Sequence, residues 1–133
     1  MKDLVTSEIA RQNVLNNRYA LEEVQKVIGL RGVIFEDEIR FTKQQVASFF
    51  EVSDRTINSC LIRNDQELRK NGYEVLDGNR LKIFKLSFER LDDREVNFLI
   101  KSNKLGIFNF RAFLNIAMLL SKSERAREIR SLV

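Results

Sequence analysis

Apolar residues in the first third of the chain follow a helical period and then alternate. This pattern predicts a helix over about Asp3–Asn16 and a second over Tyr19–Ile28, which Gly29 can end. The short apolar runs Gly32–Phe35 and Ile39–Phe41 flank an acidic turn, and this arrangement predicts a small β-hairpin. The hairpin leads directly into the next motif.

The stretch Thr42–Arg63 has the apolar spacing of a helix-turn-helix, in which two short helices cross closely. Thr42 and Gln45 form a capping-box sequence for the first helix, and Ser53 or Asp54 can cap the second. The residues expected to face inward, one of them in the turn, are Val46, Ala47, Phe50, Val52, Ile57, Cys60 and Leu61. An ordinary helical hairpin in a core would have the same spacing. Only the outward-facing residues of the second helix can therefore distinguish a helix-turn-helix from such a hairpin.

The outer face of the second helix is rich in groups that recognise base edges. Arg and Asn make paired hydrogen bonds to guanine and adenine, and Ser can bond to either. A helix that is merely solvated more often carries Lys and Glu. This face therefore favours contact with DNA bases over a plain packing hairpin. The residues expected to contact bases are Arg55, Asn58, Ser59, Ile62 and Arg63.

A second hairpin is expected after the motif. The second helix should end near Gly72, and the apolar runs Tyr73–Leu76 and Arg80–Leu86 then flank a turn that contains glycine. A hairpin directly after a recognition helix is a wing, which covers the core and can contact the DNA backbone. Phosphate contacts are expected from Lys43, Gln44, Thr56, Arg80 and Lys82.

Three further helices are expected beyond the wing. Asp92 begins the first, Asn109–Leu120 is a strongly apolar second, and Ser121 with Glu124 caps the last. The last helix stops while still apolar, which indicates that the natural chain is longer.

The expected fold class is mainly α with small β-hairpins (α+β). It consists of a winged helix-turn-helix at 42–90 with an N-terminal part, 1–41, and basic C-terminal helices, 91–133.

Composition excludes several kinds of chemistry. The 133 residues include no His, which removes His-based acid–base catalysis and most catalytic zinc sites. A single cysteine, Cys60, forms no intrachain disulfide and suits a reducing cytoplasm. No apolar run approaches membrane-spanning length. Turns and helix caps explain the acidic clusters Glu36–Glu38 and Asp92–Asp93 better than a metal does. We expect no enzyme, no metal and no cofactor.

Two parts of the chain resemble known proteins. Bacterial and prophage-borne DNA-binding proteins, a group that includes RhuM-like regulators, have an N-terminal region that is similar to NNRYALEEVQKVIGLRGVIFEDEIRFTKQQVASFFEVSDRTINSCLIRNDQELRKNGYEVL. Phage antirepressor-type regulators contain a segment that resembles FRAFLNIAMLLSKSERAREIRSLV. The resemblance implies a mobile-element context and groove-facing roles for Arg55, Asn58 and Ser59. The chain departs from the usual pattern at Glu51, where the turn often has Gly.

The sequence thus predicts a cytoplasmic, sequence-selective double-stranded DNA-binding protein that regulates transcription. The net charge is only +4, so affinity for DNA must come from local clustering of basic residues. One unit contacts few bases, and we therefore expect a homodimer that pairs through the Phe110–Leu120 helix or through further C-terminal residues. The alternative is an antirepressor-like adaptor that grips another regulatory protein. A nucleic-acid-processing enzyme would need a carboxylate cluster beside the groove, and the sequence offers no convincing one.

Overall fold

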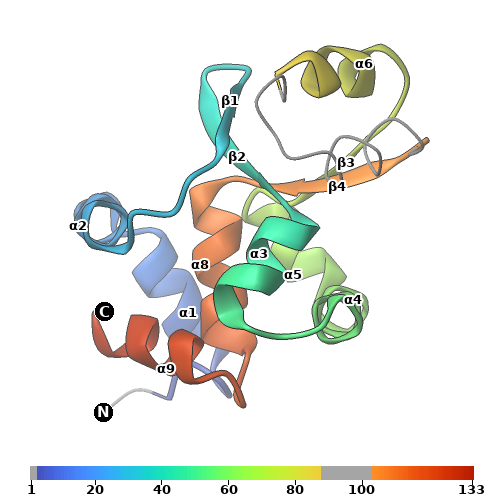
Figure 1. Ribbon diagram of the computed structural model, residues 1–133. Coiled ribbons are helices and arrows are strands. Elements are labelled where there is room, and N and C mark those ends of the chain that lie inside the picture. Colours follow the sequence, from blue (N-terminus) through green and yellow to red (C-terminus); the bar gives the residue numbers. More distant parts are fainter. Residues whose placement is uncertain (1–2, 88–102) are drawn as a thin grey trace.

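The computed structural model describes residues 3–87 and 103–133, which form eight helices and a four-stranded antiparallel sheet (Figure 1). The helices are α1 (Glu8–Leu15), α2 (Arg18–Ile28), α3 (Lys43–Phe50), α4 (Asp54–Arg63), α5 (Asp65–Lys70), α6 (Gly78–Leu86), α8 (Phe110–Leu119) and α9 (Glu124–Ser131). The strands are β1 (Val33–Phe35), β2 (Glu38–Thr42), β3 (Glu74–Leu76) and β4 (Leu105–Phe108). The fold is α+β with a small sheet, as expected. The helix expected from Asp92 lies outside the described residues.

The N-terminal elements agree with the sequence pattern apart from their ends. Ser7 caps α1, so this helix is shorter than the predicted Asp3–Asn16. Asn17 caps α2, and Gly29 ends it in a left-handed conformation. The predicted hairpin is confirmed, because β1 pairs with β2. Both residues of its turn, Glu36 and Asp37, have positive φ (52° and 65°), as a type I′ turn requires.

The second predicted hairpin is wrong in its second strand. Residues Arg80–Leu86 belong to α6, and the partner of β3 is β4, with Glu74 opposite Ile107 and Leu76 opposite Leu105. The apolar residues of this segment misled the prediction because they fit a strand and a helix alike. Leu81 and Phe84 are buried one helical turn apart, whereas Ile83, expected in a strand, is 57% exposed.

The sheet has an apolar core on each of its faces. The strand order is β1-β2-β4-β3, so β4 lies between β2 and β3. Successive side chains of a strand point to opposite faces. Phe108 accordingly packs into the large core with the helices, and Ile107 packs into a smaller core. In Figure 1, α6 lies on the opposite side of β3 and β4 from α4 and α5. The smaller core consists of Phe35, Leu76, Leu81, Phe84, Leu105 and Ile107.

Helix α8 is the centre of the large core. Every residue from Ala112 to Met118 is fully buried, and Figure 1 shows the helix surrounded by α1, α3 and α9. A helix that is buried on all sides is a core element. The expectation that this helix forms a dimer interface is therefore wrong, because its side chains are used within one chain.

The C-terminal arginines bind the ends of other helices. Arg130 donates hydrogen bonds to the carbonyl oxygens of Ala117 and Leu120, both at 2.8 Å, at the end of α8. A cation stabilises the negative end of a helix dipole in this way. The last helix begins two residues later than predicted, because Ser123 and not Ser121 caps α9.

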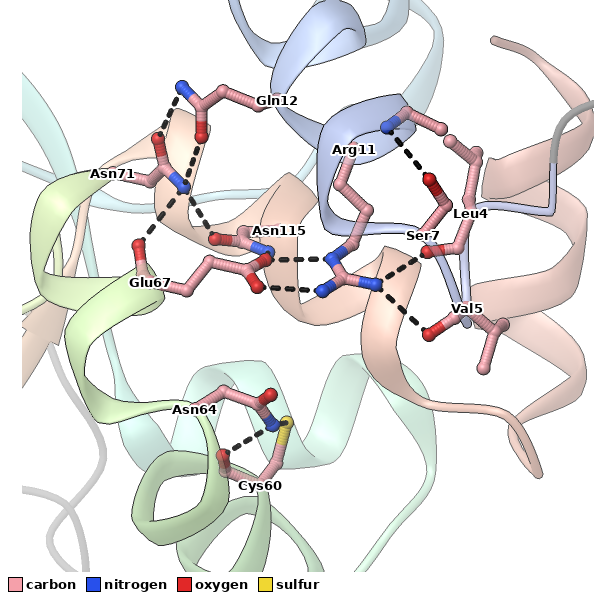
Figure 2. A network of polar contacts seen from close by, with 11 residues as sticks. Leu4, Val5, Ser7, Arg11, Gln12, Cys60, Asn64, Glu67, Asn71 and Asn115 are labelled. Atoms are coloured by element: carbon pink, nitrogen blue, oxygen red, sulfur yellow. Dashed lines mark hydrogen bonds and ion pairs between the residues drawn. The ribbon is translucent and has the colours of Figure 1, made fainter.

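A buried ion pair connects α1 to α5. The Arg11 Nε and Nη2 atoms donate to the two carboxylate oxygens of Glu67 at 2.8 and 2.7 Å. Both side chains are more than nine-tenths buried. The remaining nitrogen, Nη1, donates to the carbonyl oxygens of Leu4 and Val5, so each nitrogen of the guanidinium has a partner (Figure 2). Such paired geometry offsets the cost of removing two charges from water.

Asparagines extend this network to α8. The Asn115 Nδ2 atom donates to Glu67 at 2.6 Å, and the Asn115 Oδ1 atom accepts from Asn71 at 2.8 Å (Figure 2). Arg111 then donates to Asn71 at 2.9 Å and to the Leu15 carbonyl at 2.6 Å. Three helices that are distant in sequence, α1, α5 and α8, are thus joined by one set of polar contacts.

Replacing Glu67 should destabilise the protein strongly. Glu67→Gln leaves the Arg11 charge buried without its counter-charge, which costs about 3 kcal/mol or more of the free energy of unfolding. Urea unfolding followed by circular dichroism measures this loss. The control is Glu23→Gln, which alters an exposed ion pair with Lys26 and should change stability by less than about 0.5 kcal/mol. Equal losses in the two variants would contradict the role assigned to the buried pair.

Stability should also fall as the pH is lowered. Burial would raise the pKa of Glu67, but the hydrogen bonds from Arg11 and Asn115 outweigh it, so this pKa lies below its ordinary value of 4.5. The unfolded chain therefore takes up the proton before the native protein does. The stability that Glu67 contributes is present above about pH 4.5 and is lost as the pH falls through the native pKa.

Urea unfolding between about pH 7 and about pH 3 tests this expectation. The parent chain should lose more stability over this range than Glu67→Gln, because the variant has no carboxylate to protonate. An equal or greater loss in the variant would show that another group is responsible.

Candidate nucleic-acid interface

Side chains at both helix starts position α3 and α4. The Thr42 Oγ1 atom accepts from the Gln45 amide at 3.2 Å, and the Gln45 side chain accepts from the Thr42 amide at 2.9 Å. This is the predicted capping box. The Ser53 hydroxyl accepts from the Thr56 amide at 3.2 Å, so Ser53 and not Asp54 caps α4. Local sequence therefore fixes where both helices begin.

The inner faces of α3 and α4 are buried as predicted. Ala47 is small enough to lie in the region where the two helices meet, and Ile57 is fully buried. Cys60 is a small core residue, and its burial raises the pKa of its thiol. The other buried residues of the two faces are Val46, Phe50 and Leu61, and Val52 packs against them.

The turn between α3 and α4 has a left-handed backbone at Glu51, the position where a helix-turn-helix often has Gly. Glu51 is in the left-handed region, with φ 57° and ψ 42°, although it is not a glycine. The next amide, of Val52, donates to the Ala47 carbonyl at 3.0 Å and closes the turn. A residue with a Cβ atom is strained in this conformation by about 1 kcal/mol or more.

The second helix is shorter than predicted. The sequence suggested one helix that continues to Gly72, but α4 ends at Arg63 and α5 follows at a break. Asn64 makes this break, with φ −128° and with its side chain donating to the Cys60 carbonyl at 3.0 Å. An Asn side chain competes for helical carbonyls in this way.

The outer face of α4 is entirely exposed. Figure 1 shows α4 at the edge of the molecule. Arg55, Ser59 and Ile62 follow one another at i, i+4 and i+7 and so form the outermost line of the helix, and Ile62 is 81% exposed. These three residues line one open depression together with Thr56 and Arg63. Asn58 is exposed beside them.

The charge of this face is not neutralised by the rest of the described chain. Within residues 3–87 and 103–133, neither Arg55 nor Arg63 forms an ion pair. Six other arginines do, namely Arg11, Arg40, Arg69, Arg80, Arg125 and Arg127. Carboxylates mark the limits of the face, with Asp54 at the start of α4 and Asp65 just beyond its end.

The expected phosphate-binding residues fall into two groups. Lys43 and Gln44 lie partly exposed in the first turn of α3, and Thr56 is exposed on α4 with its hydroxyl 3.1 Å from the Ser53 hydroxyl. Arg80 and Lys82 lie on α6 and not on a strand, because the second half of the predicted hairpin is helical. The structure therefore keeps the first group near α4 and moves the second to another element.

Arg80 is already engaged within the protein. It forms ion pairs with Glu36 and with Glu74, the latter at 2.6 Å, and these hydrogen bonds raise its pKa. Glu74 also binds Arg40 at 2.8 Å. Burial would raise the pKa of Glu74, but the hydrogen bonds from Arg80 and Arg40 lower it overall. Arg80 thus fastens α6 to the sheet, which reduces the positive charge it can offer to a phosphate.

Lys104 is a basic residue that the sequence reasoning missed. It is exposed immediately before β4, at the end of the strand pair that takes the place of the expected wing. The signal for it was the alternation of Leu105 and Ile107, which is typical of a strand.

The described residues offer neither a membrane-spanning helix nor an acidic metal cluster. No helix in the described ranges is long and apolar enough to cross a bilayer. The same ranges contain no cluster of three or more Cys, Asp or Glu residues that could hold a metal ion. The acidic pair Asp92–Asp93 lies outside the described residues. The cluster Glu36–Glu38 forms the β1–β2 turn and the start of β2.

Replacing Glu51 with glycine should stabilise the protein. Gly adopts the left-handed conformation without strain, so Glu51→Gly should raise the free energy of unfolding by about 0.5 kcal/mol, even after the entropy cost of glycine. The matched control is Glu23→Gly within α2, which should lower it by about 1 kcal/mol. Urea unfolding compares the two. A loss of stability in both variants would show that Glu51 is not strained.

Comparisons with protein-family models, with curated proteins and with solved structures found no match to this chain. The resemblance to RhuM-like and antirepressor-type regulators therefore stays a prediction. The geometry of α4 and of the sheet beside it is therefore the basis from which a function can be inferred.

Proposed function

We propose that this protein binds double-stranded DNA selectively, as a winged helix-turn-helix with α4 in the major groove. The order of elements supports this. One strand, β2, precedes the two helices α3 and α4, and β3 and β4 follow them. Strand β4 lies between β2 and β3, which is the arrangement that closes a winged-helix sheet. Here α6 and the residues after it connect the two strands of the wing.

The unpaired, exposed face of α4 is the observation that carries the proposal. Of the arginines in residues 3–87 and 103–133, six form ion pairs; Arg55 and Arg63 are among those that do not, and they lie together on one exposed face. The same face holds Asn58 and Ser59, whose side chains have no hydrogen-bond partner within residues 3–87 and 103–133. Arg and Asn with free donors and acceptors are the residue types that read guanine and adenine edges.

The dimensions of α4 suit the groove. A helix with its side chains is about 10–12 Å wide, and the major groove of B-DNA is about 12 Å wide. The roles we assign are guanine recognition by Arg55, adenine recognition by Asn58, and a hydrogen bond from Ser59. Lys43 and Gln44 at the start of α3 would lie against a backbone phosphate, where the free amides of the helix also attract an anion.

Two copies of this chain would serve a single regulatory site. Ten residues of helix extend about 15 Å, enough for only about four base pairs, so useful specificity needs a second half-site. We propose a homodimer on DNA and a role as a transcriptional regulator of a mobile element or prophage. Its dimer surface lies elsewhere than α8, which is buried.

Substitutions on α4 test the proposal. A preferred duplex is first enriched from a random library with the purified chain. Arg55→Ala or Asn58→Ala should then cost about 1–3 kcal/mol of binding free energy for this duplex and relax base choice at one position. Fluorescence anisotropy measures the affinity. The control is Arg18→Ala, which removes an exposed arginine from α2 and should leave affinity nearly unchanged.

Two further results distinguish DNA binding from the antirepressor-like alternative. Lys43→Ala should weaken binding to all sequences alike and reduce the dependence of affinity on salt, because Lys43 at the start of α3 is assigned to a backbone phosphate, whereas Lys82 lies on α6, across the sheet from α4. The antirepressor-like alternative predicts binding to a protein in place of DNA. No duplex would be enriched, and the chain would bind another regulatory protein with little dependence on salt.

A further inference from the structure

Ile62 is an apolar side chain on a face that otherwise offers hydrogen bonds. It is 81% exposed, the highest value among the exposed large apolar residues of the described chain. It lies on the outermost line of α4 with Arg55 and Ser59, and it lines the same depression. A single exposed apolar residue is common on protein surfaces, so exposure alone has no meaning here. Its position on the outermost line of the proposed reading face does.

The major groove offers one apolar feature that such a side chain can recognise. Guanine, cytosine and adenine present hydrogen-bond donors and acceptors there, whereas thymine also presents its C5-methyl group. Ile is β-branched and adopts essentially one χ1 rotamer in a helix. It therefore loses little conformational entropy when it contacts a methyl group, unlike a long flexible side chain.

We infer that Ile62 reads a thymine by packing against its 5-methyl group, which rests on the proposed binding of DNA through α4. Ile62 lies seven residues after Arg55, or roughly 10 Å along the helix axis. The thymine would accordingly lie as far as about three base pairs from the guanine that Arg55 contacts. Ser59 lies between the two on the same line.

Removing single methyl groups from the DNA tests this inference. In the enriched duplex, each thymine is replaced in turn by deoxyuridine, which lacks only the 5-methyl group and keeps the same hydrogen bonds. One replacement should weaken binding of the parent chain about three- to fivefold, the contribution of one buried methyl group. The other replacements should have little effect.

Variants of the protein complete the test. Ile62→Ala should bind the thymine and the deoxyuridine duplex equally, because the contact no longer exists. Val27→Ala removes another exposed β-branched residue, 69% exposed on α2, and should keep the full discrimination of the parent chain.

The outcomes separate the two proposals. If a duplex is enriched but no deoxyuridine replacement weakens binding, the methyl contact is wrong and DNA binding stands. The same conclusion follows if Ile62→Ala keeps the discrimination. If no duplex is enriched over random sequence, DNA recognition itself is wrong, and the role of Ile62 is overturned with it.

Discussion

The buried pair of Arg11 and Glu67 is the constraint on which the rest of the structure depends. Burying two charges costs several kcal/mol for each ion, and the cost is offset only when every donor and acceptor has a partner. Arg11 therefore requires the carbonyl oxygens of Leu4 and Val5, and Glu67 requires the amide of Asn115. The pair thus dictates the position of three helices at once and tolerates few alternatives.

The same ion pair also helps to fix the position of α4, which carries the proposed reading face. Glu67 lies on α5, which follows α4 after a single residue, so a fixed Glu67 fixes the end of α4. At the turn between α3 and α4, Arg125 donates to the Phe49 carbonyl and Ser123 donates to the Phe50 carbonyl, where α3 stops. Both supports come from segments far away in sequence. A helix held in this way loses little conformational entropy when it binds a partner, which would favour the affinity of the proposed DNA contact.

Local features could be predicted from the sequence and distant ones could not. The cap of α3 involves Thr42 and Gln45 only, and the apolar face of α4 has a clear period, so both were predicted correctly. The partner of β3 was missed because Leu76 and Leu105 pair across a long intervening segment. The Arg11–Glu67 contact spans 56 positions, and no local pattern marks it. Among the residues expected to contact DNA, the exposure of Arg55 and Asn58 could be predicted from the helical period of α4. The ion pairs of Arg80 with Glu36 and Glu74 could not be predicted, because they join different elements of the fold.

The central place of α8 has a consequence for how the chain is made. A ribosome delivers α1 to α5 well before α8, which is almost last, yet α8 fills the middle of the core on which α1, α3 and α5 pack. Until it emerges, the earlier helices lack the central helix against which their apolar faces pack, and their sheet lacks β4, the strand between β2 and β3. A domain of this kind acquires its structure as a unit once synthesis has passed residue 119, and the exposed face of α4 is held in place only at that stage.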